Sequence, residues 1–135
     1  MIKILYVEDN DDNVYMLKMR LELLGDFEVL AAEDGQKGCE MAVSECPDII
    51  LMDLEMPVVD GWEATRRLKG NPQTRDIPVI VITSLDLDAK DRERLNAGVQ
   101  FVLVKERFRP ADLVERIRRL VHSKPPVSNE MEAAS

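Results

Sequence analysis

The chain has 135 residues, of which 45% are hydrophobic, and its formal net charge is −8. This length and apolar content suit one compact domain with its own core. The negative charge argues against nucleic-acid binding through the bulk surface, because nucleic-acid phosphates would be repelled. The longest apolar runs have the length of strands and are interrupted by charges, so we expect neither a signal peptide nor a membrane span, and a cytoplasmic location.

Strand-like apolar runs alternate with helix-period runs along the chain. The first half predicts strands at Ile2 to Val7, Phe27 to Ala32 and Asp48 to Met52, a helix with Val14, Leu17, Leu21 and Leu24 on its buried face that ends at Gly25, and a helix from Gly35 to Ser44. The second half predicts a helix ending near Gly70, a loop at 71–78, strands at Pro78 to Thr83 and Phe101 to Val104, a helix from Asp88 to Ala97 that stops at Gly98, and a last helix beginning at Pro110 with Leu113, Ile117 and Leu120 inward. The two cysteines, Cys39 and Cys46, lack metal-site spacing, and we expect them to be buried or half-buried thiols.

Strands that alternate with helices predict an α/β fold with a doubly wound parallel sheet and right-handed crossovers. The strands are continuous apolar runs, as expected for a sheet covered on both faces. We expect this domain to span residues 1–122. Residues 123–135 have too few apolar groups to pack, so we expect a disordered tail there, with no room for a further output domain.

Polar side chains follow four of the predicted strands. Glu8 and Asp9 end the first strand, Asp53 ends the third, Thr83 ends the fourth, and Lys105 follows the fifth. Taken singly, each residue has an ordinary structural explanation, since acids cap helices, threonine is common in strands and lysine is usually solvated. In a parallel sheet, however, all these strand ends lie at one edge, where ligands bind. We therefore expect three carboxylates, a hydroxyl and an ammonium group to converge.

The chemistry of this cluster indicates a divalent metal. Carboxylates repel one another unless a cation lies among them, and carboxylates with water are the ligands that Mg²⁺ prefers. A carboxylate beside such a metal can attack a phosphorus atom and form an acyl phosphate, whose charge a lysine, a hydroxyl and the metal neutralise. Asp53 follows the apolar run 49–52, where a charge is costly to bury. We therefore expect Asp53 to be the residue that is phosphorylated.

The same residues carry a resemblance to a known family. The stretch DLEMPVVDG at 53–61, with VEDN at 7–10, VITS at 81–84, AG at 97–98 and Lys105, resembles the receiver domain of two-component response regulators over nearly all of residues 1–122. The resemblance implies a flavodoxin-like sheet with strand order 2-1-3-4-5.

The resemblance also implies roles for the site residues. Asp53 would accept a phosphoryl group from a histidine kinase or a histidine phosphotransfer protein. Asp9 and Asp53 would bind Mg²⁺ together with the backbone carbonyl of Glu55, while Glu8 would act through water. Thr83 and Lys105 would contact the phosphoryl group.

Two positions depart from the family pattern. The family usually has an aromatic switch residue three positions before the lysine, where this chain has Val102, and its nearest aromatic, Phe101, should point to the other face of the strand. The family also usually has a proline after the lysine, where this chain has Glu106. We expect a trans or locally strained peptide bond there, because a cis bond before a residue other than proline costs roughly 3–4 kcal/mol. The surface of the fourth helix, fifth strand and fifth helix is therefore expected to be remodelled.

That surface carries a basic patch on an otherwise acidic chain. Its members are Arg107, Phe108, Arg109, Arg116, Arg118 and Arg119. One interpretation is a solvated helix face with a tucked phenylalanine. The other is a docking or homodimer surface with Phe108 as its anchor.

Three classes of function remain open. The first is a single-domain response regulator that is not an enzyme acting on an external substrate, assists its own phosphorylation and dephosphorylation, and signals to a downstream protein through altered contacts. The second is an interaction module on the same fold that works without phosphorylation. The third is a phosphatase that forms an aspartyl phosphate, although such enzymes normally have Asp-x-Asp where this chain has Glu55 as the third residue.

Overall fold

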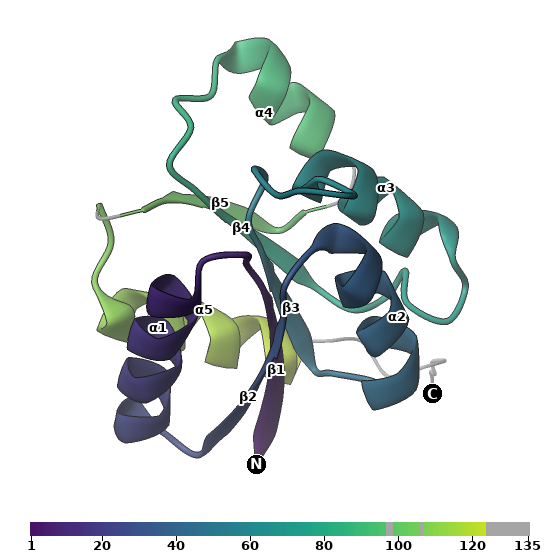
Figure 1. The fold of residues 1–135 in the computed structure, drawn as a ribbon. Helices are drawn as coiled ribbons and strands as arrows, with labels where there is room; N and C mark the ends of the chain where they lie inside the picture. The colour runs from purple at the N-terminus through teal and green to yellow at the C-terminus, as the bar shows by residue number, and fades with distance from the viewer. Residues whose placement is uncertain (97–98, 106, 124–135) are drawn as a thin grey trace.

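The computed structural model describes residues 1–96, 99–105 and 107–123. Five parallel strands form one sheet in the order β2-β1-β3-β4-β5. The strands are β1 (Ile2–Val7), β2 (Phe27–Ala32), β3 (Ile49–Met52), β4 (Val79–Thr83) and β5 (Phe101–Val104). The helices are α1 (Asp11–Leu24), α2 (Gly35–Glu45), α3 (Gly61–Gly70), α4 (Ala89–Asn96) and α5 (Pro110–Ser123). This arrangement confirms the doubly wound sheet and its strand order (Figure 1).

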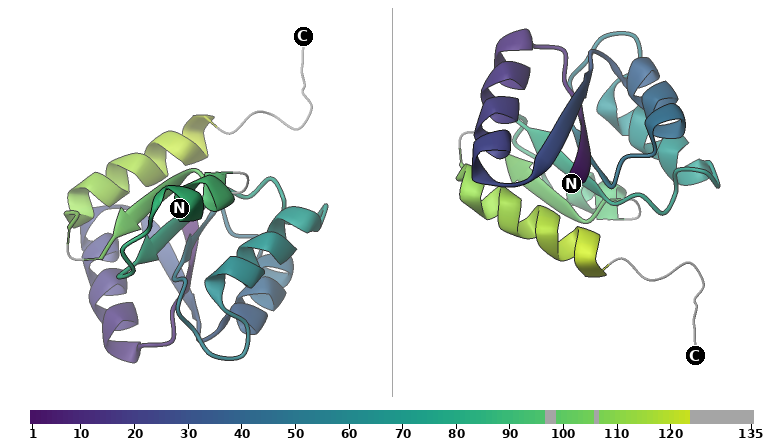
Figure 2. Two further views of the ribbon diagram at one scale, coloured as in Figure 1. Left: turned by 90° about the horizontal axis from the view of Figure 1, so that it is seen from above. Right: turned by 90° about the horizontal axis from the view of Figure 1, so that it is seen from below.

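Helices cover both faces of the sheet. Successive residues of each strand point to opposite faces, so each strand contributes side chains to two cores. Ile4 and Tyr6 of β1 belong to a core that also contains side chains of α1 and α5. Leu5 and Val7 belong to a second core, formed with α2 and α3. Figure 2 shows α1 and α5 on one side of the sheet and α2 and α3 on the other. A smaller buried cluster of Leu54, Val81, Leu87 and Leu95 lies where α4 meets the body of the protein.

Capping side chains fix where three helices begin after the strands. Asn10, Asp34 and Asp60 each accept a hydrogen bond from the backbone N–H three residues further on, at 2.9, 2.8 and 2.9 Å. Each bond satisfies an N–H group that the helix itself leaves without a partner. The first turns of α1, α2 and α3 are therefore anchored at the edge of the sheet where the strands end.

The predicted strand boundaries are confirmed to within one residue. Two details of the sequence interpretation are wrong. Leu24 does not share the buried face of α1 and is 47% exposed, because it is the last helical residue before the chain leaves the helix at Gly25. Cys46 is an exposed free thiol, because it caps the end of α2 with a left-handed φ of 49°, away from the packed face of the helix. Cys39 is a half-buried free thiol, as expected.

Some sequence expectations fall on residues outside the described part of the chain. The helix α5 extends to Ser123, and the rest of the predicted tail, residues 124–135, lies outside it, as do Ala97, Gly98 and Glu106. No described helix is long and apolar enough to cross a membrane.

Candidate functional site

Backbone hydrogen bonds hold the site residues at the carboxyl ends of the strands. Each of the three residues that follow β1, β3 and β5 still pairs with a neighbouring strand. The N–H of Glu8 donates to Ala32 at 2.9 Å, and the N–H of Asp53 donates to Val7 at 3.0 Å. The N–H of Lys105 donates to the carbonyl of Thr83 at 2.8 Å. These side chains therefore start from rigid sheet backbone even though they lie just beyond the strands.

The backbone of Asp53 is also packed tightly against the start of α3. A Cβ at Gly61 would lie 2.0 Å from the carbonyl oxygen of Asp53, so only glycine fits there. The N–H of Gly61 donates to the carbonyl of Leu54 at 3.1 Å. The intervening loop includes Val58 at φ 68°, a left-handed conformation that is unfavourable for a β-branched residue. The sequence between Asp53 and α3 is thus bent sharply back to the strand end.

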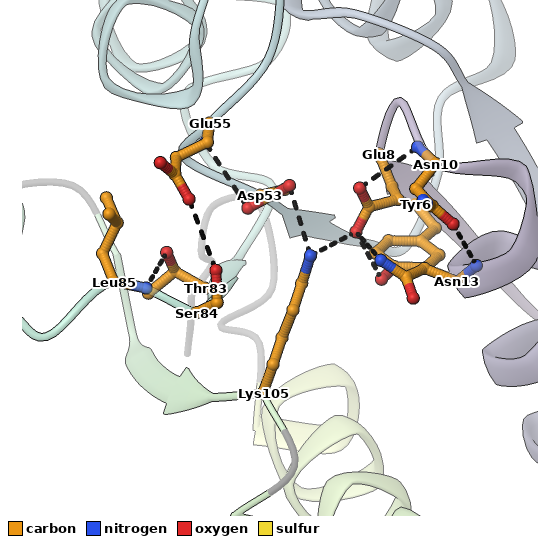
Figure 3. Close-up of polar contacts among 10 residues, drawn as sticks. All are labelled: Tyr6, Glu8, Asn10, Asn13, Asp53, Glu55, Thr83, Ser84, Leu85 and Lys105. Atoms are coloured by element: carbon orange, nitrogen blue, oxygen red, sulfur yellow. Dashed lines mark hydrogen bonds and ion pairs between the residues drawn. The ribbon is translucent and has the colours of Figure 1, made fainter.

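Lys105 joins the two buried carboxylates of the site. Its ammonium nitrogen Nζ lies 2.7 Å from Oε1 of Glu8 and 3.3 Å from Oδ2 of Asp53. The hydroxyl of Tyr6 donates to the same oxygen of Glu8 at 3.1 Å. Figure 3 shows the amine of Lys105 between the two acids, with Tyr6 beside Glu8. The predicted convergence of residues from distant strands is confirmed for these side chains.

Burial and crowding change the proton affinities in the site. Asp53 is 3% exposed. Its burial and the nearby charge of Glu8 raise its pKa to about 6, against the opposing charge of Lys105. Burial alone would raise the pKa of Glu8, but the hydrogen bond and charge of Lys105 lower it overall. Burial alone would lower the pKa of Lys105, and the two carboxylates raise it overall. In the absence of a metal, Asp53 therefore holds its charge less favourably than Glu8, the other buried acid of the site.

The acidic cluster fits a divalent cation. One carboxylate oxygen from each of Glu8, Asp9 and Asp53 can be chosen so that all three lie within 4.8 Å of one another. Among the described residues, Lys105 is the one cation within 4.0 Å of these carboxylates, so negative charge is in excess. Carboxylate oxygens at this density, with Asp9 exposed to solvent, are the ligands that Mg²⁺ takes together with water.

Glu55 and Thr83 lie on the other side of Asp53 from Glu8 (Figure 3). The N–H of Glu55 donates to Oδ1 of Asp53 at 3.4 Å, while its own carboxylate accepts a hydrogen bond from the Ser84 hydroxyl at 3.3 Å. Thr83 is fully buried, and its hydroxyl accepts from the N–H of Leu85 at 3.1 Å. The Glu55 side chain is therefore held by the β4 end, which leaves only its backbone directed toward the acidic cluster.

The sequence interpretation missed three polar partners. Tyr6 lies two residues before Glu8, so strand alternation could have placed both on one side of β1. Ser84 directly follows Thr83, and this adjacency was an available signal. The Asn13 amide donates to Glu8 across 3.5 Å, and no spacing rule indicates that contact.

Acidic neighbours neutralise two arginines of the predicted basic patch in the structure. Arg109 pairs with Asp112 at 3.4 Å, and Arg119 pairs with Glu115 at 3.8 Å. Phe108 is half-buried against the core formed with α1 and α5. It also lines a hollow of about 320 Å³ beside Lys105, with Met16 and Arg20 of α1 among the other walls.

Val102 occupies the position at which the family pattern has an aromatic switch residue. It is half-buried and packs against the cluster of Leu54, Val81, Leu87 and Leu95. The side chain of Phe101 and all of Glu106 lie outside what the structure describes, so the expectations for their orientation and peptide bond stay predictions.

Comparison with known proteins gives a consistent result. Residues 4–118 match the family model described as response regulator receiver domain. Response regulator PleD of Caulobacter vibrioides is 39% identical over 125 residues, which cover 90% of this chain and 26% of PleD. Protein PilH of Pseudomonas aeruginosa is 43% identical over 86 residues, which cover 64% of this chain and 70% of PilH. The chain therefore spans only about a quarter of the length of PleD.

Solved structures agree with the sequence relatives. The receiver domain of the sensor histidine kinase PA1611 from Pseudomonas aeruginosa superposes with a TM-score of 0.80 at 36% identity, covering 90% of this chain and 98% of that domain. That structure has a magnesium ion coordinated in its active site cleft. The chemotaxis protein CheY4 of Vibrio cholerae superposes with a TM-score of 0.79 at 28% identity, covering 89% of this chain and 98% of that protein.

Proposed function

The chain belongs to the response regulator receiver domain family, and we propose that it accepts a phosphoryl group on Asp53 from a histidine kinase or a histidine phosphotransfer protein. The observation that carries the proposal is the meeting of Glu8, Asp53 and Lys105 from three separate strand ends, with the amine of Lys105 between the two buried carboxylates. Asp53 lies on rigid backbone and next to a cation, which suits a carboxylate nucleophile.

The transfer needs an ionised Asp53. With a pKa of about 6, its carboxylate is mostly charged at neutral pH while remaining poorly neutralised by its surroundings. A carboxylate oxygen of Asp53 forms a bond to phosphorus as the bond between phosphorus and the donor histidine nitrogen breaks, and the electron pair leaves with the imidazole. The amine of Lys105 is within reach of the phosphoryl oxygens, because it already contacts Asp53 at 3.3 Å.

We propose Mg²⁺ as the cofactor, held by Asp9 and Asp53 with the backbone carbonyl of Glu55, and by Glu8 through water. When bound, this ion supplies positive charge that balances the carboxylates and the transferred phosphoryl group. Tyr6 donates to Glu8, and Lys105 bridges Glu8 and Asp53. Tyr6 and Lys105 would therefore hold the two carboxylates in place for Mg²⁺.

The signal would start at the end of β4. The Thr83 hydroxyl can donate to a phosphoryl oxygen on Asp53 while it continues to accept from the N–H of Leu85. Such a contact would draw Thr83 toward Asp53 and change the hydrogen bond between Ser84 and Glu55. We therefore propose that phosphorylation alters the loop between β4 and α4, and through it the contacts with a downstream protein in the cytoplasm.

Intact-mass spectrometry tests the proposal. The full chain is incubated with Mg²⁺ and acetyl phosphate, alongside Asp53→Ala and the matched control Asp26→Ala. Asp26 lies at the opposite end of β1, where its carbonyl accepts from the N–H of Ile2. We expect one phosphoryl adduct on the wild type and on Asp26→Ala, and none on Asp53→Ala or after removal of the metal. An adduct that persists in Asp53→Ala would contradict the assignment.

A module that works without phosphorylation is the second candidate, and Val102 is the observation that favours it. Position 102 has no aromatic ring, so the buried cluster beneath α4 lacks the aromatic switch residue that is usual in the family. This alternative expects partner binding to survive Asp53→Ala, whereas the first expects binding to depend on Asp53. A phosphatase is disfavoured, because the carboxylate of Glu55 is held by Ser84 and its N–H, not its acid group, contacts Asp53.

A further inference from the structure

A hollow of about 350 Å³ lies between α3 and α4, apart from the acidic site. Figure 1 shows α4 at the top of the molecule with α3 beside it, above α1 and α5. The walls are formed by α3 and α4, and the lining residues are Trp62, Glu63, Thr65, Arg66, Lys69, Gly70, Arg94 and Leu95. The one carboxylate among them, Glu63, is paired with Arg66 and Arg67. The volume of the hollow is at the lower end of the range for small-molecule sites, and the hollow combines an aromatic ring with several cations.

The cations of the hollow are not equally free to bind an anion. Arg66 is bound by the carboxylate of Glu63, at 2.9 Å through Nε and 2.5 Å through a terminal nitrogen. Lys69 donates to two backbone carbonyls, at 3.0 and 2.8 Å. Arg94 stacks over the ring of Trp62, 4.4 Å from its centroid, and forms no ion pair with any described residue. Its planar guanidinium is therefore the group best able to bind an incoming acid.

Thr65 provides a second and independent indication of a ligand. The residue is only 5% exposed, and its hydroxyl is the one buried side-chain polar atom without a partner in the described part of the chain. Buried hydroxyls are normally hydrogen-bonded, because leaving one unpaired is unfavourable. Thr65 lines the hollow, so a ligand that pairs with this hydroxyl binds there.

We propose that the hollow between α3 and α4 binds a small aromatic anion. Its acid group pairs with Arg94 and accepts a hydrogen bond from Thr65, and its ring packs against Trp62 and Leu95. The lining fits this class of ligand because it offers one cation without an ion pair in the described part of the chain, one hydroxyl without a partner and an apolar wall. Within the described part of the chain, none of these residues forms a hydrogen bond or ion pair with Asp53, so binding can be tested on the unphosphorylated protein.

The chain contains a single tryptophan, which makes the test specific. The indole N–H of Trp62 gives one cross-peak in a proton–nitrogen correlation spectrum of the labelled full chain. The probes are naphthalene-2-sulfonate and its neutral analogue naphthalene-2-sulfonamide. We expect the sulfonate to shift the Trp62 peak saturably with a Kd on the order of 1 mM, as suits a probe of this size. We expect the sulfonamide to bind about tenfold more weakly.

Charge variants on α4 separate the pocket from general electrostatics. Arg94→Gln should weaken sulfonate binding about tenfold. Arg92→Gln removes the same charge from an exposed position of α4 that does not line the hollow, and should leave the Kd unchanged. Equal losses in both variants would overturn the proposal, as would no shift of the Trp62 peak or equal binding of the two probes.

Thr65 variants separate binding from folding. Thr65→Val should raise the Kd about three- to tenfold, because one hydrogen bond to the ligand is lost. Its melting temperature should be unchanged or higher, because the free protein loses only an unpaired hydroxyl of similar shape. Thr65→Ser keeps the hydroxyl and should keep the wild-type Kd. A Thr65→Val variant that binds as tightly as the wild type would overturn the role of Thr65.

Discussion

Replacing Asp53 by asparagine should stabilise the metal-free protein, even though it removes the carboxylate that we propose as the phosphoryl acceptor. Asp53 is 3% exposed, and its burial together with the charge of Glu8 raises its pKa from 3.8 to about 6. A carboxyl group with a raised pKa in the folded state is one whose ionised form the fold disfavours. Asparagine keeps the shape and removes the charge, but its amide nitrogen cannot accept one of the two hydrogen bonds that the carboxylate receives from Lys105 and from the N–H of Glu55.

The size and the pH dependence of the gain follow from this shift. One pKa unit corresponds to about 1.4 kcal/mol, so the upper bound on the cost of the ionised form is about 3 kcal/mol. Because asparagine gives up one of the two hydrogen bonds and the charge attraction to Lys105, we expect a gain below that bound, of about 1–2 kcal/mol at pH 7.5. As the pH falls from about 6 to about 4, the folded protein takes up the proton before the unfolded chain does, so the cost of ionisation disappears. The gain should therefore shrink toward zero near pH 4.

Urea unfolding in the presence of a metal chelator, at pH 7.5 and at pH 4.5, measures the difference in the free energy of unfolding between the wild type and Asp53→Asn. The control is Asp26→Asn, whose side chain is 79% exposed and should change stability by less than about 0.5 kcal/mol. Addition of Mg²⁺ should stabilise the wild type more than Asp53→Asn, because only the wild type keeps the full set of carboxylates. The reasoning is refuted if Asp53→Asn is no more stable than the wild type at pH 7.5, or if its gain is the same at both pH values.

Three further predictions concern the surroundings of the site. Lys105→Met leaves two buried carboxylates without a nearby cation and should lower the free energy of unfolding by about 3 kcal/mol in metal-free urea unfolding; a loss below about 1 kcal/mol would contradict this. Gly61→Ala introduces a Cβ 2.0 Å from the carbonyl oxygen of Asp53 and should lower the free energy of unfolding by about 2 kcal/mol or more. Its control is Gly70→Ala, where a Cβ meets no atom within 4 Å and the change should be neutral or slightly stabilising. Equal shifts of the melting temperature in the two variants would refute the packing argument. If Phe108 anchors a homodimer, light scattering should give a dimer mass for the wild type and a monomer mass for Phe108→Asp, and identical monomer masses would end that interpretation.

The meeting of Glu8, Asp53 and Lys105 could be predicted because it depends only on topology. Parallel strands bring their carboxyl ends to one edge, so residues far apart in sequence are placed together once the strands are recognised. The order of the strands followed from the family resemblance and not from the apolar pattern. The exposure of Leu24 and Cys46 could not be predicted in the same way, because exposure at a helix end depends on how the chain leaves the helix.

The pKa of Asp53 and the hollow between α3 and α4 could not be predicted from the sequence for a different reason. The raised pKa of Asp53 reflects its burial and its distance from Glu8, and neither quantity has a signature in residue spacing. The hollow between α3 and α4 arises from the relative placement of two helices, and the unpaired hydroxyl of Thr65 becomes visible only once its neighbours are known.

Locating the acyl phosphate on the chain tests the central claim most directly. The protein is incubated with Mg²⁺ and acetyl phosphate, reduced with borohydride to convert phosphorylated aspartate to homoserine, and sequenced by tandem mass spectrometry. We expect homoserine at position 53 and at no other aspartate, and only when the metal is present. Homoserine at Asp9 or elsewhere, or its complete absence from a folded sample supplied with Mg²⁺, would contradict the assignment of Asp53 as the phosphoryl acceptor.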